Sequence, residues 1–527
     1  MKTNKYYDNI FIGSGINSLV GAALLAKSGK KVLLLERSDY IGGCIKSKEV
    51  ENCIIDLFST AYPLLLTSKA YELLAEDLEK ESIEFISNDK PTATILNSGE
   101  SFILYKDRAK NIENLNKLMP GDGDTYNKYL QFVEKNADFL FTLLSSEIRT
   151  KSFLIYMAKH LFKNGIKNSI DDIGEYLPTI SSQIETQIKS PLLKATLAPW
   201  VLHTGLSVHS PFSALMSKII CFTLEFVGTP FIKGGSYKIV EALQAIIEKN
   251  GGEFSINKDV VEIISKDNIA LGVKTKDNVI YNGKNIIANV TPNALYGKLL
   301  KNQREKNPII YKQAKEFKFN SKGNMQIHLI LKEKISWKDS SLNEVGYIHI
   351  TDGIDAVSKA INEASRGALP TNPTICIAQP SNSDPSRVKD GKSVLWIQLP
   401  ETPYFPTLDS ANELNELIKE GWSEELKEAY SNRIINLISK HLPALKENII
   451  YKEIISPKDL YDTNINLEKG DPYSGECELE QYLLFRPLKG TKNHETPYRN
   501  LFHIGASTHP GPGLGAGSGV HIYEKLK

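Results

Sequence analysis

A glycine-containing loop and an acidic residue near the N-terminus could together bind a dinucleotide. The loop residues are Gly13, Ser14, Gly15, Asn17 and Ser18. Glycines let a backbone turn tightly and approach a pyrophosphate, whose negative charge is stabilised at the N-terminus of the helix that follows. Glu36 lies roughly 20 residues further on, where a carboxylate can bind both ribose hydroxyls and disfavours a 2′-phosphate. We therefore predict that these residues contact a dinucleotide cofactor.

The segments around this loop have the patterns needed to position it. Residues 7–12 alternate and are rich in aromatic and β-branched side chains, which is typical of a strand. Residues 19–26 repeat leucine and alanine with helical spacing, and the pattern stops at Gly29. Residues 31–35 form a second apolar strand that ends at Glu36. Strand, glycine loop, helix, strand and acid in this order indicate a βαβ dinucleotide-binding unit.

A basic residue and a Gly-Gly turn follow Glu36 and narrow the kind of cofactor. Arg37, Gly42, Gly43 and Cys44 extend the motif beyond the acid at which most nicotinamide dehydrogenases stop. Here the sequence resembles the FAD-dependent oxidoreductases of the phytoene-dehydrogenase-like superfamily, which is related to the amine oxidases. Amine-oxidase-type relatives often carry arginine after the Gly-Gly pair. This chain has Cys44 instead, so the pyrophosphate would lose a cationic partner there.

The resemblance continues along nearly the whole chain. Similar blocks occupy residues 56–66, 228–243, 379–393, 482–487 and 502–519. Together they are most similar to the branch named for a "pyridine nucleotide-disulfide oxidoreductase domain-containing" protein, which also includes some carotene ketolases. The resemblance implies FAD as the cofactor, with Val261 near the adenine. It also implies that the C-terminal block closes the flavin site through Gly505, Gly513, Leu514 and Gly515.

The predicted fold class is α/β, with a discontinuous Rossmann-type FAD-binding domain and an α+β substrate domain that has a helical cap. The FAD-binding domain is expected in three pieces, residues 1–90, 228–300 and 470–527. Residues 91–227 are expected to be a mainly helical cap or substrate region. Residues 301–469 are expected to form a substrate domain with its own sheet, because strand patterns at 324–331 and 393–399 alternate with helical patterns at 410–420 and 424–440.

Catalytic residues are not identified by any motif, and four side chains are candidates. Tyr62 and Arg486 lie in family-like blocks, His203 lies in an apolar stretch, and His509 precedes a proline in the C-terminal glycine block. Each has an alternative structural interpretation, as a core side chain or as part of an ion pair. No histidine pair has the spacing H-x-x-x-H and no cysteine pair the spacing C-x-x-C, so we predict no metal site.

Composition excludes several classes of protein. With 63 Lys and Arg against 62 Asp and Glu, the net charge of +1 gives no electrostatic case for nucleic acid binding. Five cysteines without a paired motif argue against a disulfide framework. With no secretory signal and no apolar run long enough to span a membrane, we expect a cytoplasmic protein. Lysines flank an apolar face within residues 151–167, so peripheral contact with a membrane is a second possibility.

The predicted activity is FAD-dependent hydride transfer to or from a C–C or C–N bond of a mostly apolar small molecule, as a dehydrogenase, desaturase or saturase. A second redox motif is missing from the sequence, so oxygen, a quinone or another diffusible molecule is the expected electron acceptor. The alternatives are a carotenoid or isoprenoid desaturase, isomerase or ketolase, an amine oxidase, and a non-catalytic prenyl-binding escort protein of the same fold. The sequence does not indicate an oligomeric state.

Overall fold

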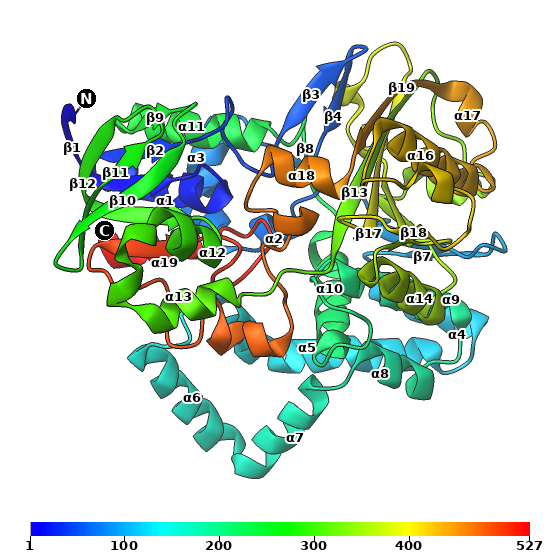
Figure 1. Ribbon diagram of the computed structural model, residues 1–527. Coiled ribbons are helices and arrows are strands. Elements are labelled where there is room, and N and C mark those ends of the chain that lie inside the picture. Colours follow the sequence, from blue (N-terminus) through cyan, green and yellow to red (C-terminus); the bar gives the residue numbers. More distant parts are fainter. Residues whose placement is uncertain (1) are drawn as a thin grey trace.

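A mainly parallel sheet forms one half of the molecule (Figure 1). The computed structural model describes residues 2–527. β1 (Lys2–Ile12) pairs in parallel with β2 (Val32–Leu35) and β12 (Ile280–Asn289), while β9 (Glu253–Ser255) adds to β2 and β20 (Leu501–Ile504) adds to β12. The apolar run in β2 is buried on both faces, as expected for an inner parallel strand. An antiparallel ribbon of β10 (Val260–Lys266) and β11 (Ile269–Thr275) extends from β12.

Helix α1 (Ile16–Lys27) packs between α11 (Lys238–Lys249) and α19 (Gly517–Leu526). Helices α1 and α19 can approach closely because glycines lie at their contact. A Cβ added to Gly519 would lie 2.2 Å from the carbonyl oxygen of Asn17, and one added to Gly21 would lie 3.1 Å from that of Gly519. The two ends of the chain therefore meet beside the first dinucleotide-binding loop.

A second sheet has the strand order β19-β13-β17-β16-β14-β6-β7. These strands are β19 (Ile449–Ile455), β13 (Lys322–Leu331), β17 (Ser393–Pro403), β16 (Ile375–Ala378), β14 (Tyr347–Ile350), β6 (Thr92–Ile95) and β7 (Ser101–Leu104). Side chains alternate between its faces. Ile348 and Ile397 pack with α16 (Glu424–Ser439), whereas Tyr347 and Trp396 face the helical part of the chain.

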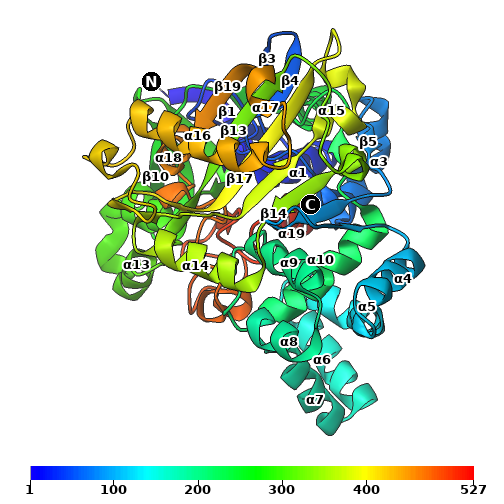
Figure 2. The same cartoon turned by 90° about the vertical axis from the view of Figure 1, so that its right-hand side faces the viewer.

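The helical part is formed by seven consecutive helices. They are α4 (Arg108–Leu118), α5 (Asp122–Ser145), α6 (Lys151–Asn164), α7 (Ile166–Tyr176), α8 (Ile180–Gln187), α9 (Pro191–Leu202) and α10 (Ser213–Val227). Helices α9 and α10 pack against each other next to the second sheet, and α14 (Ile354–Ser365) packs on α9. By contrast, α6 and α7 project from the body as a V in both views (Figures 1 and 2).

Short elements connect these parts. They are β3 (Ser47–Val50), β4 (Cys53–Asp56), α2 (Pro63–Leu66), α3 (Lys69–Lys80), β5 (Phe85–Ile86), β8 (Phe231–Ile232), α12 (Pro292–Ala294), α13 (Pro308–Lys315), β15 (Ala368–Leu369), α15 (Pro380–Ser383), β18 (Leu408–Asp409), α17 (Leu445–Asn448) and α18 (Pro457–Thr463). None of the helices in residues 2–527 has the length and apolar character needed to cross a membrane.

The predicted α/β fold class is confirmed, while the proposed division into domains stays a prediction. Strands β6 and β7 fall in the stretch expected to be mainly helical, and they complete one edge of the second sheet. The helix expected at 424–440 is present as α16, but the one expected at 410–420 is wrong. Turns form there instead, because the Asp409 carboxylate accepts the backbone N–H groups of Glu413 and Leu414 and so competes with helical bonding.

Candidate functional site

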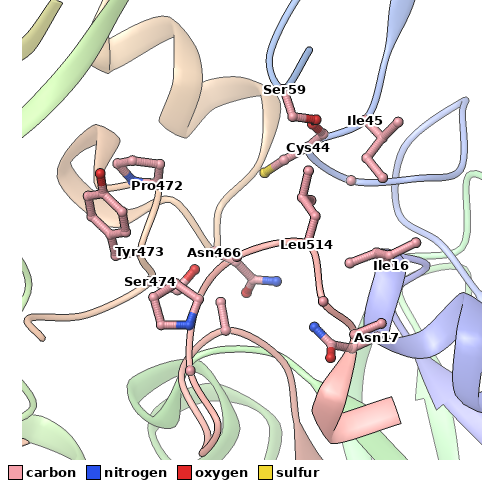
Figure 3. Close-up of a pocket in the computed structure, with 18 of the residues that line it drawn as sticks. Ile16, Asn17, Cys44, Ile45, Ser59, Asn466, Pro472, Tyr473, Ser474 and Leu514 are labelled. Carbon is pink, nitrogen blue, oxygen red and sulfur yellow. The ribbon is translucent and has the colours of Figure 1, made fainter. Parts of the chain in front are cut away.

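A cavity of about 1500 Å³ runs from the loop after β1 to the inward face of the second sheet. Its lining comes from the N-terminal loops, from β12 to β14 and from the segments around residues 460–474 and 506–517. Figure 3 shows how these segments converge, with Asn17, Cys44, Asn466 and Leu514 around one part of the cavity. We call the part lined by residues 13–17, 36–44 and 513–517 the glycine end.

Glycine backbones make close contacts at the glycine end. Gly13 follows β1 with φ +87°, a conformation that side chains rarely adopt. A Cβ on Gly15 would lie 3.3 Å from Asn289 Nδ2, and a Cβ on Gly43 would lie 3.3 Å from the Cα of Gly15. Gly15 is the N-cap of α1, whose first-turn N–H groups have no partner within the helix. The geometry therefore leaves an anion-binding helix N-terminus at the cavity wall.

Glu36 is fixed at the end of β2 by hydrogen bonds to its carboxylate. Ser14 donates from its backbone N–H at 2.9 Å and from Oγ at 2.7 Å to one oxygen, and the Ser38 N–H donates at 2.9 Å to the other. A carboxylate has about four acceptor sites, so capacity is left for ribose hydroxyls. Arg37 and Val261 line the same part of the cavity, as the adenosine half of a dinucleotide would require.

Cys44 presents a neutral thiol where relatives of the amine-oxidase type often carry a cation. Its sulfur lies 3.5 Å from Asn464 Nδ2, and burial raises the pKa of the thiol to about 11. The side chain thus carries no charge near neutral pH. Charge compensation for a pyrophosphate at this position rests on the backbone N–H groups of the glycine loops.

Most of the predicted cofactor contacts line the cavity, and two lie behind it. Those in the lining are Gly13, Ser14, Gly15, Asn17, Glu36, Arg37, Gly42, Gly43, Cys44, Val261, Gly513, Leu514 and Gly515. Ser18 instead accepts a hydrogen bond of 2.9 Å from Asn289 Nδ2. A Cβ on Gly505 would lie 2.2 Å from Asn289 Oδ1. These two residues surround the side chain of Asn289, which in turn supports the loop.

Sequence reasoning missed Asn289 and the segment after α18. Asn464, Asn466, Pro472, Tyr473 and Ser474 all line the cavity. Asn466 Nδ2 donates to the carbonyl of Asn289 at 3.1 Å, which joins this segment to the end of β12. No spacing or glycine pattern distinguishes these residues in the sequence, so only the fold reveals them.

Tyr62 and His203 line the cavity, as their candidacy requires. The Tyr62 hydroxyl lies 3.1 Å from Ser59 Oγ, and burial raises its pKa, so it stays protonated. His203 ends α9, and burial lowers the pKa of its imidazole to about 4. It is therefore a neutral side chain near pH 7, able to accept a proton or to bind a metal.

Arg486 and His509 have structural partners elsewhere. The Arg486 guanidinium donates to the backbone carbonyls of Ala506 at 2.7 Å, Glu476 at 2.9 Å and Tyr473 at 2.9 Å. This differs from both interpretations offered by the sequence, a substrate contact and an ion pair. His509 Nε2 lies 2.8 Å from the carbonyl oxygen of Ser146. Neither residue is part of the cavity lining within residues 2–527.

The far part of the cavity is apolar, and we call it the apolar end. Its side chains come from α9, α10, β14 and β17 and are Trp200, Met216, Ile219, Ile220, Leu224, Tyr347 and Trp396. Trp396 is held in place because its indole N–H donates to the carbonyl of Phe58 at 2.7 Å. Within residues 2–527, the carboxylates of the lining are Glu36, Asp259 and Glu524, which follow β2, precede β10 and lie in α19.

The glycine end fits FAD on the structure's own evidence. The Gly-Gly turn lies against the first glycine loop, since Gly15 and Gly42 form a parallel β-bridge. Any Cβ at Gly13 or Gly43 would combine a strained positive φ with contacts of 3.2 and 3.3 Å, so the loops are built to bring bare backbone to the cavity. The fixed carboxylate of Glu36 and the N-terminus of α1 supply the expected ribose and pyrophosphate partners.

Comparison with known proteins agrees with this assignment. The family model described as "Flavin containing amine oxidoreductase" matches residues 19–514. The chain is similar to a limonene dehydrogenase chain of Castellaniella defragrans, with 22% identity over 100% of this chain and 95% of the relative. It is also similar to pyridine nucleotide-disulfide oxidoreductase domain-containing protein 2 of Mus musculus, with 23% identity over 99% and 94%.

Two further comparisons complete the assignment. A phytoene desaturase of Rhodobacter capsulatus is 23% identical over 98% of this chain and 93% of its own. Among solved structures, an oxidoreductase from Methanosarcina mazei superposes with a TM-score of 0.62 and 15% identity over 100% of both chains. The predicted resemblance is thereby confirmed, including its branch. The chain belongs to the flavin-containing amine oxidoreductase family and is an FAD-dependent oxidoreductase.

Proposed function

We propose that this enzyme dehydrogenates, or saturates, a carbon–carbon bond of a mostly apolar small molecule, with FAD held at the glycine end. FAD supplies the two-electron acceptor or donor when bound. The observation that carries the proposal is the apolar end, whose side chains can exclude water from a hydrocarbon and hold it by burial alone. The similarity to a limonene dehydrogenase and to a phytoene desaturase supports an isoprenoid substrate.

A C–N bond is the alternative, and the charges disfavour it. An amine substrate arrives as an ammonium ion, which needs a carboxylate or an aromatic cage when it leaves water. The three carboxylates that line the cavity in residues 2–527 all belong to the elements of the first sheet and its helices. His203 is neutral and cannot attract a cation by charge. A neutral substrate therefore matches the apolar end better than an amine does.

Anaerobic flavin reduction distinguishes these possibilities. The FAD-loaded enzyme would be mixed with matched pairs of isoprenoids, each a hydrocarbon or alcohol and its primary amine analogue, while the flavin absorbance is followed. We expect bleaching by the neutral member of a pair and little by the amine. The reduced enzyme would then be offered oxygen and a soluble quinone, which we propose as acceptors. Bleaching by amines alone would contradict the proposal, as would rapid reduction by NADH without substrate.

We also propose that α6 and α7 rest on an anionic membrane surface. Phe162 is 94% exposed, Ile166 73% and Leu154 65%, so the projecting V carries large apolar side chains into solvent. Lys151, Lys159, Lys163 and Lys167 lie beside them and are exposed, and residues 151–170 contain no acid. Apolar side chains bordered by lysines match the interface of an anionic bilayer. A substrate dissolved in lipid would then lie near the enzyme.

Flotation with liposomes tests this contact. We expect the enzyme to float with vesicles that contain phosphatidylserine and to release as salt is raised. Replacing Phe162 and Ile166 by serine should reduce the bound fraction about tenfold, since two large apolar side chains leave the interface. Phe226→Ser is the matched control, because Phe226 is also 70% exposed but lies on α10. A concentration-dependent dimer lost in the double variant, without flotation, would instead assign this face to a second copy.

A further inference from the structure

Three metal-ligating side chains from distant parts of the chain meet beside the apolar end. They are His203 at the end of α9, His349 on β14 and Cys376 on β16. A ligand atom from each lies within 4.8 Å of the other two. His349 and Cys376 are opposite one another in the antiparallel pair of β14 and β16, so their side chains leave the same face of the sheet. The packing of α9 brings His203 to that face.

The two imidazoles face each other at bonding distance. His203 Nε2 and His349 Nε2 are 3.1 Å apart. Nδ1 of His349 is buried and has no hydrogen-bond partner within residues 2–527. The ring of Trp200 lies 4.8 Å from that of His203 and 4.9 Å from that of His349, and so it closes the cluster on one side. The cluster thus holds more lone pairs than the surrounding protein uses.

We propose that His203, His349 and Cys376 bind one monovalent soft metal ion, Cu⁺, as a three-coordinate site. Thiolate and imidazole are the ligands such an ion prefers. Ligand bonds of about 2.0–2.3 Å around a trigonal centre place the ligand atoms roughly 3.5–3.8 Å apart. The observed cluster spans this range, so side-chain rotations of about 1 Å would complete the site.

Charge favours a monovalent ion over a divalent one. On binding, the Cys376 thiol releases its proton to solvent and no electron is transferred. Cu⁺ with one thiolate is neutral, whereas Zn²⁺ would leave a net positive charge among Trp200, Tyr347 and Trp396, which is costly in an apolar environment. Burial keeps both imidazoles neutral, because it lowers the pKa of His349 well below its ordinary value and that of His203 to about 4.

Metal binding to the FAD-loaded enzyme tests this site without reference to activity. Cu⁺ would be titrated anaerobically against a chromophoric Cu⁺ chelator, and X-ray absorption would count the ligands. We expect one Cu⁺ per chain with one sulfur and two nitrogen neighbours. Cys376→Ser and His349→Gln should each weaken binding at least 100-fold. Cys221→Ser is the control, because Cys221 is also buried in this core but lies on α10 outside the cluster.

Each other outcome would overturn the site. Wild-type enzyme that binds Cu⁺ no better than Cys376→Ser excludes the thiolate ligand. A copper–sulfur signal that survives in Cys376→Ser places the ion at another cysteine. Zn²⁺ bound as tightly as Cu⁺ refutes the charge argument. FAD content and circular dichroism of each variant show whether it is folded, and the wild-type ligand count decides the question even if a variant is not.

Discussion

At the glycine end the cavity is walled by the backbone of three loops, whereas at the apolar end it is walled by side chains from two helices and two strands. Backbone walls suit a ligand whose phosphates and ribose are always the same, because N–H groups and a fixed carboxylate read common features. Side-chain walls can change residue by residue without altering the fold. The difference suggests that the glycine end determines the cofactor and the apolar end the substrate.

A buried ion network joins the two ends. Arg387 donates to Asp56 at 2.6 Å, to Asp384 at 3.2 Å and to the carbonyl of Ile232 at 2.8 Å. Asp56 ends β4, and Asp384 and Arg387 precede β17 of the second sheet. The Arg387 and Asp56 side chains are both 0% exposed. The two ends are therefore expected to depend on one another for stability although they differ in construction.

The largest expected effect comes from breaking this network. Arg387→Leu leaves two buried carboxylates without their cation, which costs about 3–5 kcal/mol of unfolding free energy. Urea denaturation of the FAD-loaded enzyme measures it. Lys233→Leu is the control, because the Lys233–Glu84 pair is half exposed and solvent screens such pairs, so its loss should be far smaller. Equal losses in both variants would show that the network does not couple the ends.

The same network gives a pH dependence. Burial alone would raise the pKa of Asp56, but the charge of Arg387 and hydrogen bonds from Ser47 outweigh it and hold the pKa below its ordinary value. A carboxyl whose pKa is lowered by folding stabilises the native state above its unfolded pKa, and this contribution is lost as the pH falls through the native value. Wild-type stability should therefore fall below about pH 4 more steeply than that of Asp56→Asn.

The next largest effect separates the ends. Gly15→Val adds a branched side chain where even a Cβ lies 3.3 Å from Asn289 Nδ2, and it fills the approach to the N-terminus of α1. We expect FAD affinity to fall about 100-fold, or about 2.7 kcal/mol, while the folded core is retained. Fluorescence titration of the apoprotein with FAD measures it. Gly174→Ala, at a helical glycine with open space around it, should bind FAD normally.

The glycine end was largely predictable from sequence, because its chemistry depends on local spacing. Gly13, Gly15, Glu36 and Gly42 lie within one βαβ unit and its next turn, so a short window contains the whole pattern. The C-terminal contacts came from the family resemblance. Asn289 and residues 464–474 could not be predicted, since nothing local distinguishes an asparagine that supports a loop from one at the surface.

The apolar end shows the opposite limit. Trp200, Met216, Tyr347 and Trp396 belong to four elements whose apolar patterns predict only burial, not which buried face borders a cavity. The missed turns at 410–420 have a related cause. The side chain of Asp409 captures backbone N–H groups and pairs with Arg433, and that tertiary contact outweighs the helical periodicity of the segment.

A smaller effect is expected at the apolar end alone. Met216→Ala removes a flexible apolar side chain from the wall formed by α10, with a loss of about 1 kcal/mol of substrate binding. The concentration of isoprenoid that gives half-maximal flavin bleaching should rise about fivefold, while FAD affinity stays unchanged. If Met216→Ala lowered FAD affinity as well, the division of labour between the two ends would be incorrect.

The smallest expected effect lies behind the glycine end. Ser18→Ala removes the acceptor for Asn289 Nδ2, a buried hydrogen bond of 2.9 Å, but leaves every residue of the cavity wall in place. Such a bond contributes about 1 kcal/mol, and only part of that reaches a ligand held by the loop. FAD affinity should therefore fall about two- to fivefold, measured by the same titration as for Gly15→Val. A loss as large as that of Gly15→Val would mean that Ser18 contacts FAD directly, as its place in the motif predicted, and that the loop is arranged differently when FAD is bound.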